Sequence, residues 1–251
     1  MSTTRAPYVC ASCARTLRTA AKPSAIRSFT TTTAKSAGAP SPDEPRWKQT
    51  PPAMQMPFRL RPMPNQPVWK VNDSVELVDS AYDRFIGQAA GRGTKGKDVL
   101  PEEIKWQALT HKSFDQGRRP YNDKLAYLGK RILDVQTSLL LAQQPLTPEN
   151  QTNQNIYVFA HPSLNGIENI TARAKSTALD KRRVSQLAKS YGLEKVVRWK
   201  PRKSDRLESS GEDVVLAQSV YAIVGAVALQ NGGDVAVQVA KERILAPLGL
   251  K

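Results

Sequence analysis

Few of the residues whose types could do chemistry stand in a catalytic pattern. Cys10 and Cys13 have the spacing of half a zinc site, but no second cysteine pair and no histidine partner follows them. His111 lies in "THKS" without a serine or cysteine nucleophile motif, so we expect a structural histidine bonded to the backbone. The Gly-rich "GRGTKGK" lacks the pattern of a phosphate-binding P-loop and is interpreted as a flexible basic turn.

Clusters of lysine and arginine give a stronger chemical signal. The 251 residues include 37 basic and 22 acidic ones, a formal net charge of +15, which favours a polyanionic partner. One cluster interleaves Trp199 with basic residues, a combination suited to phosphate contacts and stacking on an unpaired base. A solvated charged face is the alternative. We expect RNA contacts from Arg118, Arg119, Lys181, Arg182, Arg183, Arg198, Lys200, Arg202, Lys203 and Arg206.

The start of the chain has the composition of a mitochondrial leader. Residues 1–42 are rich in Ser, Thr and Ala and contain six basic residues and no acidic one. Mitochondrial transit peptides are basic, Ser-rich and acid-poor. We therefore expect a transit peptide over residues 1–37 and a mitochondrial location. Its removal would leave a net charge of +9. A basic tail that is never removed is the alternative.

Residues 38–70 are rich in proline, which blocks both helices and sheet ladders. We expect an extended arm with basic and aromatic points such as Arg46, Trp47 and Lys48. The arm should be disordered in isolation and should become ordered in a groove of a large ribonucleoprotein. An inert linker is the alternative.

The body, residues 71–251, shows helical patterns and no alternating strand pattern, which predicts an all-α fold. A helix with a cap at Asp73 or Ser74 should stop at Gly87. Residues 143–165 are polar and are interpreted as a loop. No apolar run approaches the roughly 18 residues that span a bilayer, so we expect no membrane span. Further helices are expected within residues 101–113, 122–143, 167–177, 180–192, 212–233 and 234–249.

Several motifs, taken in order, resemble the ribonuclease III endonuclease domain. "ALTHKS" at residues 108–113 is similar to that family's A-L-T-H-R-S, and "NDKLAYLGK" at 122–130 to N-E-R-L-E-F-L-G-D. "AQSVYAIVGAVALQNGG" at 217–233 is similar to A-D-x-F-E-A-L-I-G-A-I-Y-L-D-G-G. The resemblance extends over about residues 71–247 and implies the helical bundle of that family.

The resemblance also implies a metal centre that has lost its ligands. The family cuts double-stranded RNA with Mg²⁺ held by carboxylates. Its acidic positions fall here on Asp123, Ala126, Lys130, Gln218 and Tyr221, and only the first is acidic. A lysine about 4 Å from Mg²⁺ would repel the ion by roughly 8 kcal/mol at an effective dielectric constant of about 20. Millimolar to micromolar metal binding supplies only about 4 to 8 kcal/mol. We therefore expect no catalytic residue, metal or cofactor. Lys130 should instead pair with Asp123, Asp134 or a phosphate, or remain solvated.

The leader, the altered centre and the positive charge together resemble the ribonuclease III-like proteins of the fungal mitochondrial large ribosomal subunit. This implies a structural constituent that contacts large-subunit rRNA and neighbouring ribosomal proteins. It also implies pairing with a second ribonuclease III-fold protein, with a homodimer as the alternative. Tyr127 replaces the family's Phe that inserts into the partner subunit, so we expect it at the dimer interface, with core packing as the alternative. Two other hypotheses are a subunit of a mitochondrial nuclease that processes double-stranded RNA and a free RNA chaperone or assembly factor.

Overall fold

The computed structural model describes residues 45, 47–49, 69–91, 93, 95–145, 161–164 and 166–250. Within these residues the secondary structure is helical, apart from one isolated bridge between Thr110 and Arg198. The expected transit peptide, most of the expected arm and residues 146–160 of the expected loop lie outside the described residues.

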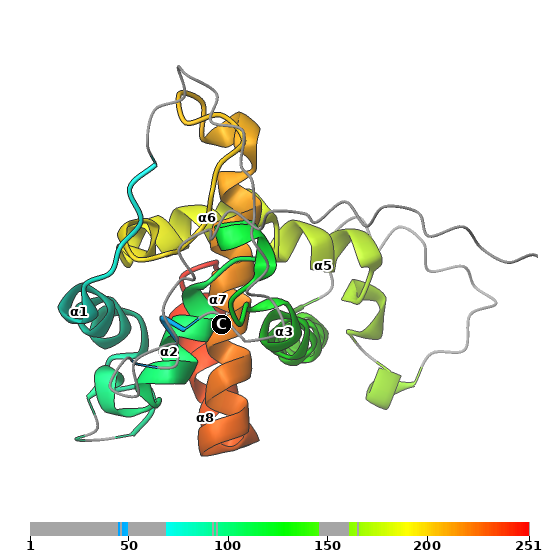
Figure 1. Ribbon diagram of the computed structural model, residues 1–251. Coiled ribbons are helices and arrows are strands. Elements are labelled where there is room, and N and C mark those ends of the chain that lie inside the picture. The colour runs from blue at the N-terminus through cyan, green and yellow to red at the C-terminus, as the bar shows by residue number, and fades with distance from the viewer. Residues whose placement is uncertain are drawn as a thin grey trace, which may run out of the picture. The chain divides into compact units, whose positions relative to one another are not determined.

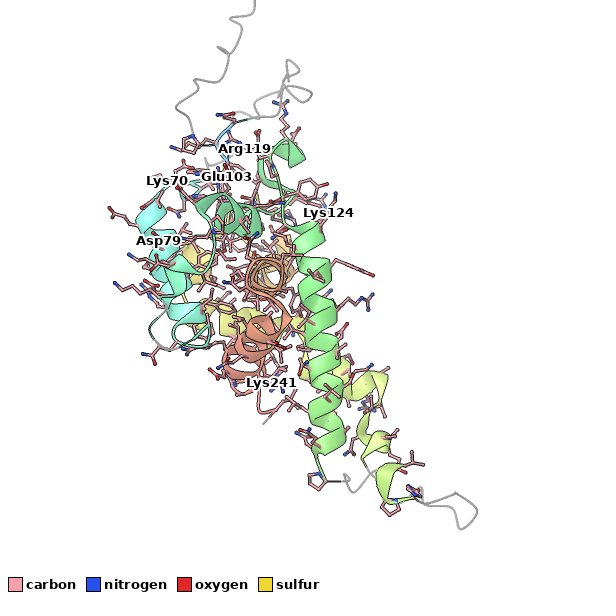
Figure 2. All side chains as sticks on the ribbon, turned by 90° about the horizontal axis from the view of Figure 1, so that it is seen from below. Lys70, Asp79, Glu103, Arg119, Lys124 and Lys241 are labelled. Carbon is pink, nitrogen blue, oxygen red and sulfur yellow. The ribbon has the colours of Figure 1, made fainter. Side chains whose placement is uncertain are left out.

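The domain is built around one central helix, α7. Figure 1 shows α7 with α6, α2 and α8 next to it, and Figure 2 looks along α7 with α3 running past one side. By length and composition α7 could cross a membrane. However, 67% of its most apolar stretch is buried inside the domain, which is typical of a core helix. A widened π turn, Ala240–Leu245, continues the last helix. The helices are α1 (Val75–Ile86), α2 (Glu102–Leu109), α3 (Asp123–Gln143), α5 (Ala172–Ala178), α6 (Lys181–Ser190), α7 (Glu212–Asn231) and α8 (Gly233–Val239).

Helix ends follow the local signals of the sequence in most places. Ser74 occupies the cap of α1, and Gly87 ends the helix with a φ of +52°, as predicted. The helix expected over residues 167–177 begins later, because the Thr171 hydroxyl accepts a hydrogen bond of 3.0 Å from the Ala174 N–H and caps α5. Residues 167–169 form a separate short turn.

Helices α3 and α7 cross with their backbones in direct contact, because each has a glycine at the crossing. A Cβ added to Gly129 would lie 1.9 Å from the Tyr221 carbonyl oxygen. A Cβ added to Gly225 would lie 2.1 Å from the Leu125 carbonyl oxygen. No side chain fits in either place, so the two glycines fix how closely the helices approach.

Trp47, expected in an extended arm, is instead part of the core of the body. The residue is 6% exposed, and its ring stacks on Trp106 with ring centroids 4.0 Å apart. The expectation that the arm becomes ordered only in a groove of a ribonucleoprotein is therefore wrong for Trp47. A large apolar ring is stabilised wherever a matching surface is available, and the chain itself provides that surface.

Gly129→Ala is expected to lower the free energy of unfolding by about 1–3 kcal/mol, the usual range for overpacking. The added methyl group would overlap the Tyr221 carbonyl and force α3 and α7 apart. Urea denaturation of the purified chain, followed by circular dichroism, measures the change.

Gly233→Ala is the matched control, since a Cβ at this helical position meets nothing within 4 Å. Alanine is also the better helix former, so this variant should be neutral or slightly stabilised. If Gly129→Ala were as stable as the wild type, the close crossing of α3 and α7 would be contradicted.

Candidate functional site

Asn122 ties together the three elements that meet at the candidate site. The residue is fully buried, and its backbone N–H donates to the Thr110 carbonyl over 3.0 Å. Its side-chain amide donates to the Ala108 carbonyl over 3.0 Å and accepts a hydrogen bond from Gln218 Nε2 over 3.1 Å. The end of α2, the start of α3 and the first half of α7 are thus held at one point.

The Asp123 carboxylate is held by two neighbouring side chains. Gln218 Nε2 donates to its Oδ1, and Lys112 Nζ lies 3.8 Å from its Oδ2. A glutamine amide can donate to a carboxylate, whereas a second carboxylate at residue 218 would repel Asp123 unless a cation lay between them. The start of α3 therefore meets α7 through a pair of groups that is stable without a metal ion.

The remaining three of the five positions differ in burial. Ala126 and Tyr221 are buried at 7% and 8% exposure, whereas Lys130 is exposed. Burial, with smaller contributions from the carboxylates of Asp134 and Asp180, raises the pKa of Tyr221 to about 12, so its hydroxyl stays protonated. In the described part of the chain, no group of three or more His, Cys, Asp and Glu side chains is placed to hold a metal ion.

Lys130 pairs with neither Asp123 nor Asp134, the two protein partners expected for it. Asp123 is paired with Lys112, and Asp134 lies 3.6 Å from Arg131 NH1. Within the residues that the structure describes, Lys130 forms no ion pair. Its ammonium group faces solvent, where an external anion can reach it.

His111 organises the turn that carries Lys112. Its Nδ1 accepts the Ser113 N–H over 3.2 Å and lies 3.0 Å from Ser113 Oγ, which in turn accepts the Lys200 N–H over 3.0 Å. Burial lowers the pKa of His111, and the Asp123 carboxylate only partly opposes this. The neutral ring with Nδ1 as acceptor fits these contacts, as expected for a structural histidine.

Arg198 contradicts the expectation that it meets RNA. Its side chain is 3% exposed, and its guanidinium carbon lies 4.3 Å from the centre of the Phe114 ring and 5.2 Å from that of Trp106. Burial lowers its pKa to about 10, which leaves it charged at neutral pH. Trp199 is likewise buried, edge-on to Trp69, and offers no free face to a base. The sequence contains a signal for this, because two valines that are also buried precede the pair.

The other expected RNA contacts divide into engaged and exposed residues. Arg119 is half-buried and donates to the backbone carbonyl oxygens of Trp47 and Lys48. Arg183 donates to the carbonyl oxygens of Thr177 and Leu248, and Arg118 is half-buried. The exposed residues are Lys181, Arg182, Lys200, Arg202, Lys203 and Arg206, together with Arg183, which is exposed although it forms these two hydrogen bonds.

Tyr127 lies on the outer face of α3, away from the core, so the alternative of core packing does not apply. The residue is 65% exposed, and the Arg131 guanidinium carbon lies 5.0 Å from the ring centre. Val135 and Leu139, further along α3, are also exposed, at 56% and 51%. A partner protein can therefore reach all three apolar side chains.

The chain belongs to the ribonuclease-III-like family, whose family model matches residues 101–248, more than half of the chain. The large ribosomal subunit protein mL57 of Neurospora crassa is 37% identical over 209 residues, which cover 82% of this chain and 76% of that protein. Two structures of the ribonuclease III nuclease domain from Campylobacter jejuni also match. Their TM-scores are 0.43 and 0.41 and their identities 19% and 22%; the matches cover 71% and 63% of this chain and 98% and 93% of those chains.

Family membership confirms the ribonuclease III-like, all-α body that the order of the motifs predicts. The similarity to a mitochondrial ribosomal protein confirms the expected mitochondrial location.

The lowered pKa of His111 predicts a stability that falls in mild acid. The unfolded chain binds a proton near pH 6.5, whereas folded His111 resists it, so stability is full above that pH and is lost as the pH falls below it. One such group accounts for at most about 1.4 kcal/mol per pH unit. Urea denaturation at pH 7.5 and 5.5 measures the loss, and His111→Gln should reduce it.

His161→Gln is the matched control, because the chain has only two histidines and this one is exposed. It should leave the pH dependence unchanged. An equal loss of stability in wild type and His111→Gln would show that another group is responsible.

Proposed function

We propose that the chain is a structural, non-catalytic constituent of the mitochondrial large ribosomal subunit, where it binds rRNA and pairs with a related ribonuclease III-fold protein. The observation that carries this proposal is the state of Asp123, whose carboxylate is already satisfied by Lys112 and Gln218. The name of the Neurospora crassa relative supports the ribosomal assignment.

A divalent cation would find few ligands at this centre. Mg²⁺ and similar hard cations need several oxygen ligands, and of the five family positions only Asp123 provides a carboxylate. An ion approaching Asp123 would have to displace the Lys112 ammonium and break the hydrogen bond from Gln218. The protein therefore holds RNA in this proposal without hydrolysing it.

The exposed cations supply the proposed contacts with rRNA. Four of them lie in the loop before α7, at Lys200, Arg202, Lys203 and Arg206, and Lys181 and Arg182 begin α6. Lys130 adds an exposed ammonium group to the outer surface of α3. Phosphate contacts of this kind release counterions, so binding should be sensitive to salt and tolerant of base sequence.

The outer face of α3 is the proposed pairing surface. Val135 and Leu139 lie about one turn apart, and Tyr127 lies about two turns before Val135, with Arg131 between them. Large apolar side chains exposed near one another are typical of a protein contact surface. A partner of the same fold could lay its own equivalent helix against these side chains, giving a pseudo-symmetric pair.

Sedimentation tests the function directly. The tagged chain, isolated from mitochondria, should stay with large ribosomal subunits after a high-salt wash, together with a second ribonuclease III-fold protein. Tyr127→Ala should lower the recovery of that partner several-fold and leave the melting temperature of the chain unchanged, because the side chain is exposed. Mass spectrometry of the large-subunit fractions measures the recovery.

The same preparation should leave duplex RNA intact in the presence of Mg²⁺ or Mn²⁺. Metal-dependent cuts that disappear in Asp123→Asn would overturn the non-catalytic assignment. A chain that never sediments with large subunits would instead favour an RNA chaperone.

Combining Arg202→Gln, Lys203→Gln and Arg206→Gln should weaken binding to large-subunit rRNA. Each lost phosphate contact reduces the slope of log K against log salt by about 0.7 to 0.9, so the slope should fall by about 2 to 3. Fluorescence anisotropy between about 50 and 200 mM KCl measures it.

Lys241→Gln is the matched control, since this exposed lysine follows α8, which begins at the end of α7 opposite the loop (Figure 1). It should retain the wild-type slope. An unchanged slope in the triple variant would exclude the loop from the RNA surface.

A further inference from the structure

Trp47 fills a cage of side chains contributed by distant parts of the chain. Its indole stacks on Trp106 of α2 at 4.0 Å with an interplanar angle of 16°. The Arg198 guanidinium carbon lies 5.2 Å from the ring centres of both tryptophans. These three side chains are almost fully buried, with whole-residue exposures of 6%, 1% and 2%.

Polar groups hold the same segment from two sides. The Trp47 indole N–H donates to Glu102 Oε1 over 3.0 Å. Arg119 donates to the carbonyl oxygen of Trp47 over 3.3 Å and also to that of Lys48. Hydrogen bonds therefore hold both the indole ring and the backbone of Trp47 in place.

The cage also supports the turn that carries Lys112. Arg198 donates its backbone N–H to the Leu109 carbonyl over 2.9 Å and accepts the His111 N–H over 2.9 Å. Loss of the Trp47 ring would take one aromatic face from the Arg198 guanidinium and expose the face of Trp106. The segment at Trp47 is thus coupled through Arg198 to the turn beside Asp123.

We propose that residues 45 and 47–49 act as a permanent latch, in which the Trp47 ring docks in the cage and holds this segment on the body of the same chain. The mature protein must then retain Trp47, so removal of the leader stops before Pro45. This role goes beyond the proposed ribosomal function and does not depend on RNA binding.

Limited trypsin digestion of the full chain tests the latch at the Lys48–Gln49 bond, because a protease must pull this segment out of the cage to cut it. Trp47→Ala should increase the rate of this cut at least tenfold and lower the melting temperature by about 10 °C, a shift typical of losing a buried tryptophan. Trp47→Phe should restore most of the protection, because a phenyl ring can still stack.

A gentler variant covers the case in which Trp47→Ala fails to fold. Glu102 is exposed, so Glu102→Ala should fold normally and still cut faster at Lys48, because it removes the acceptor of the indole N–H. Glu103→Ala is the matched control, an exposed neighbour on the same turn that should cut at the wild-type rate. Equal rates in all variants would overturn the latch.

Two further outcomes separate the latch from its alternatives. Protection should be unchanged on tenfold dilution, because the segment docks on its own chain; protection lost on dilution would show that a second copy supplies Trp47. Mass spectrometry of the chain from mitochondria should find an N-terminus before Pro45, and a mature N-terminus beyond Trp47 would overturn the proposal.

Discussion

The contact between the backbones of α3 and α7 constrains everything else in the domain. Gly129 and Gly225 let the helices approach until carbonyl oxygens of one lie where a side chain of the other would begin. This crossing keeps α7 in the centre and brings the first residues of α3 within hydrogen-bonding distance of Gln218. With a wider crossing, Asn122 could not bond α2 and α7 at the same time.

The crossing of α3 and α7 is compatible with either binding or hydrolysis, depending on which side chains lie beside it. Acidic groups on both helices would need divalent cations to lie so close together. Here Gln218 donates a hydrogen bond and Lys112 adds a positive charge, so Asp123 is balanced by the protein itself. These contacts hold the start of α3 against α7 without a metal ion.

Local signals made most of the fold predictable, and long-range contacts account for most of the errors. Ser74, Gly87 and the apolar spacing of the helices act within a few residues, so the sequence indicates them directly. The motif order likewise located Asp123 and Gln218, which the structure brings together. The burial of Trp47 depends on Trp106, 59 residues away along the chain, which no local pattern reveals. For Arg198 the two buried valines before it are a local signal, but its partner Trp106 lies 92 residues away.

A large positive charge does not by itself locate an RNA surface, because folding uses part of it. Lys105 is buried against Asp79 at 2.6 Å, Arg119 binds two backbone carbonyl oxygens, and Arg198 sits among aromatic rings. None of these three can approach a phosphate without losing its contacts in the core. The cations Lys200, Arg202, Lys203 and Arg206 in the loop before α7 are exposed, so their charge remains available to a polyanion.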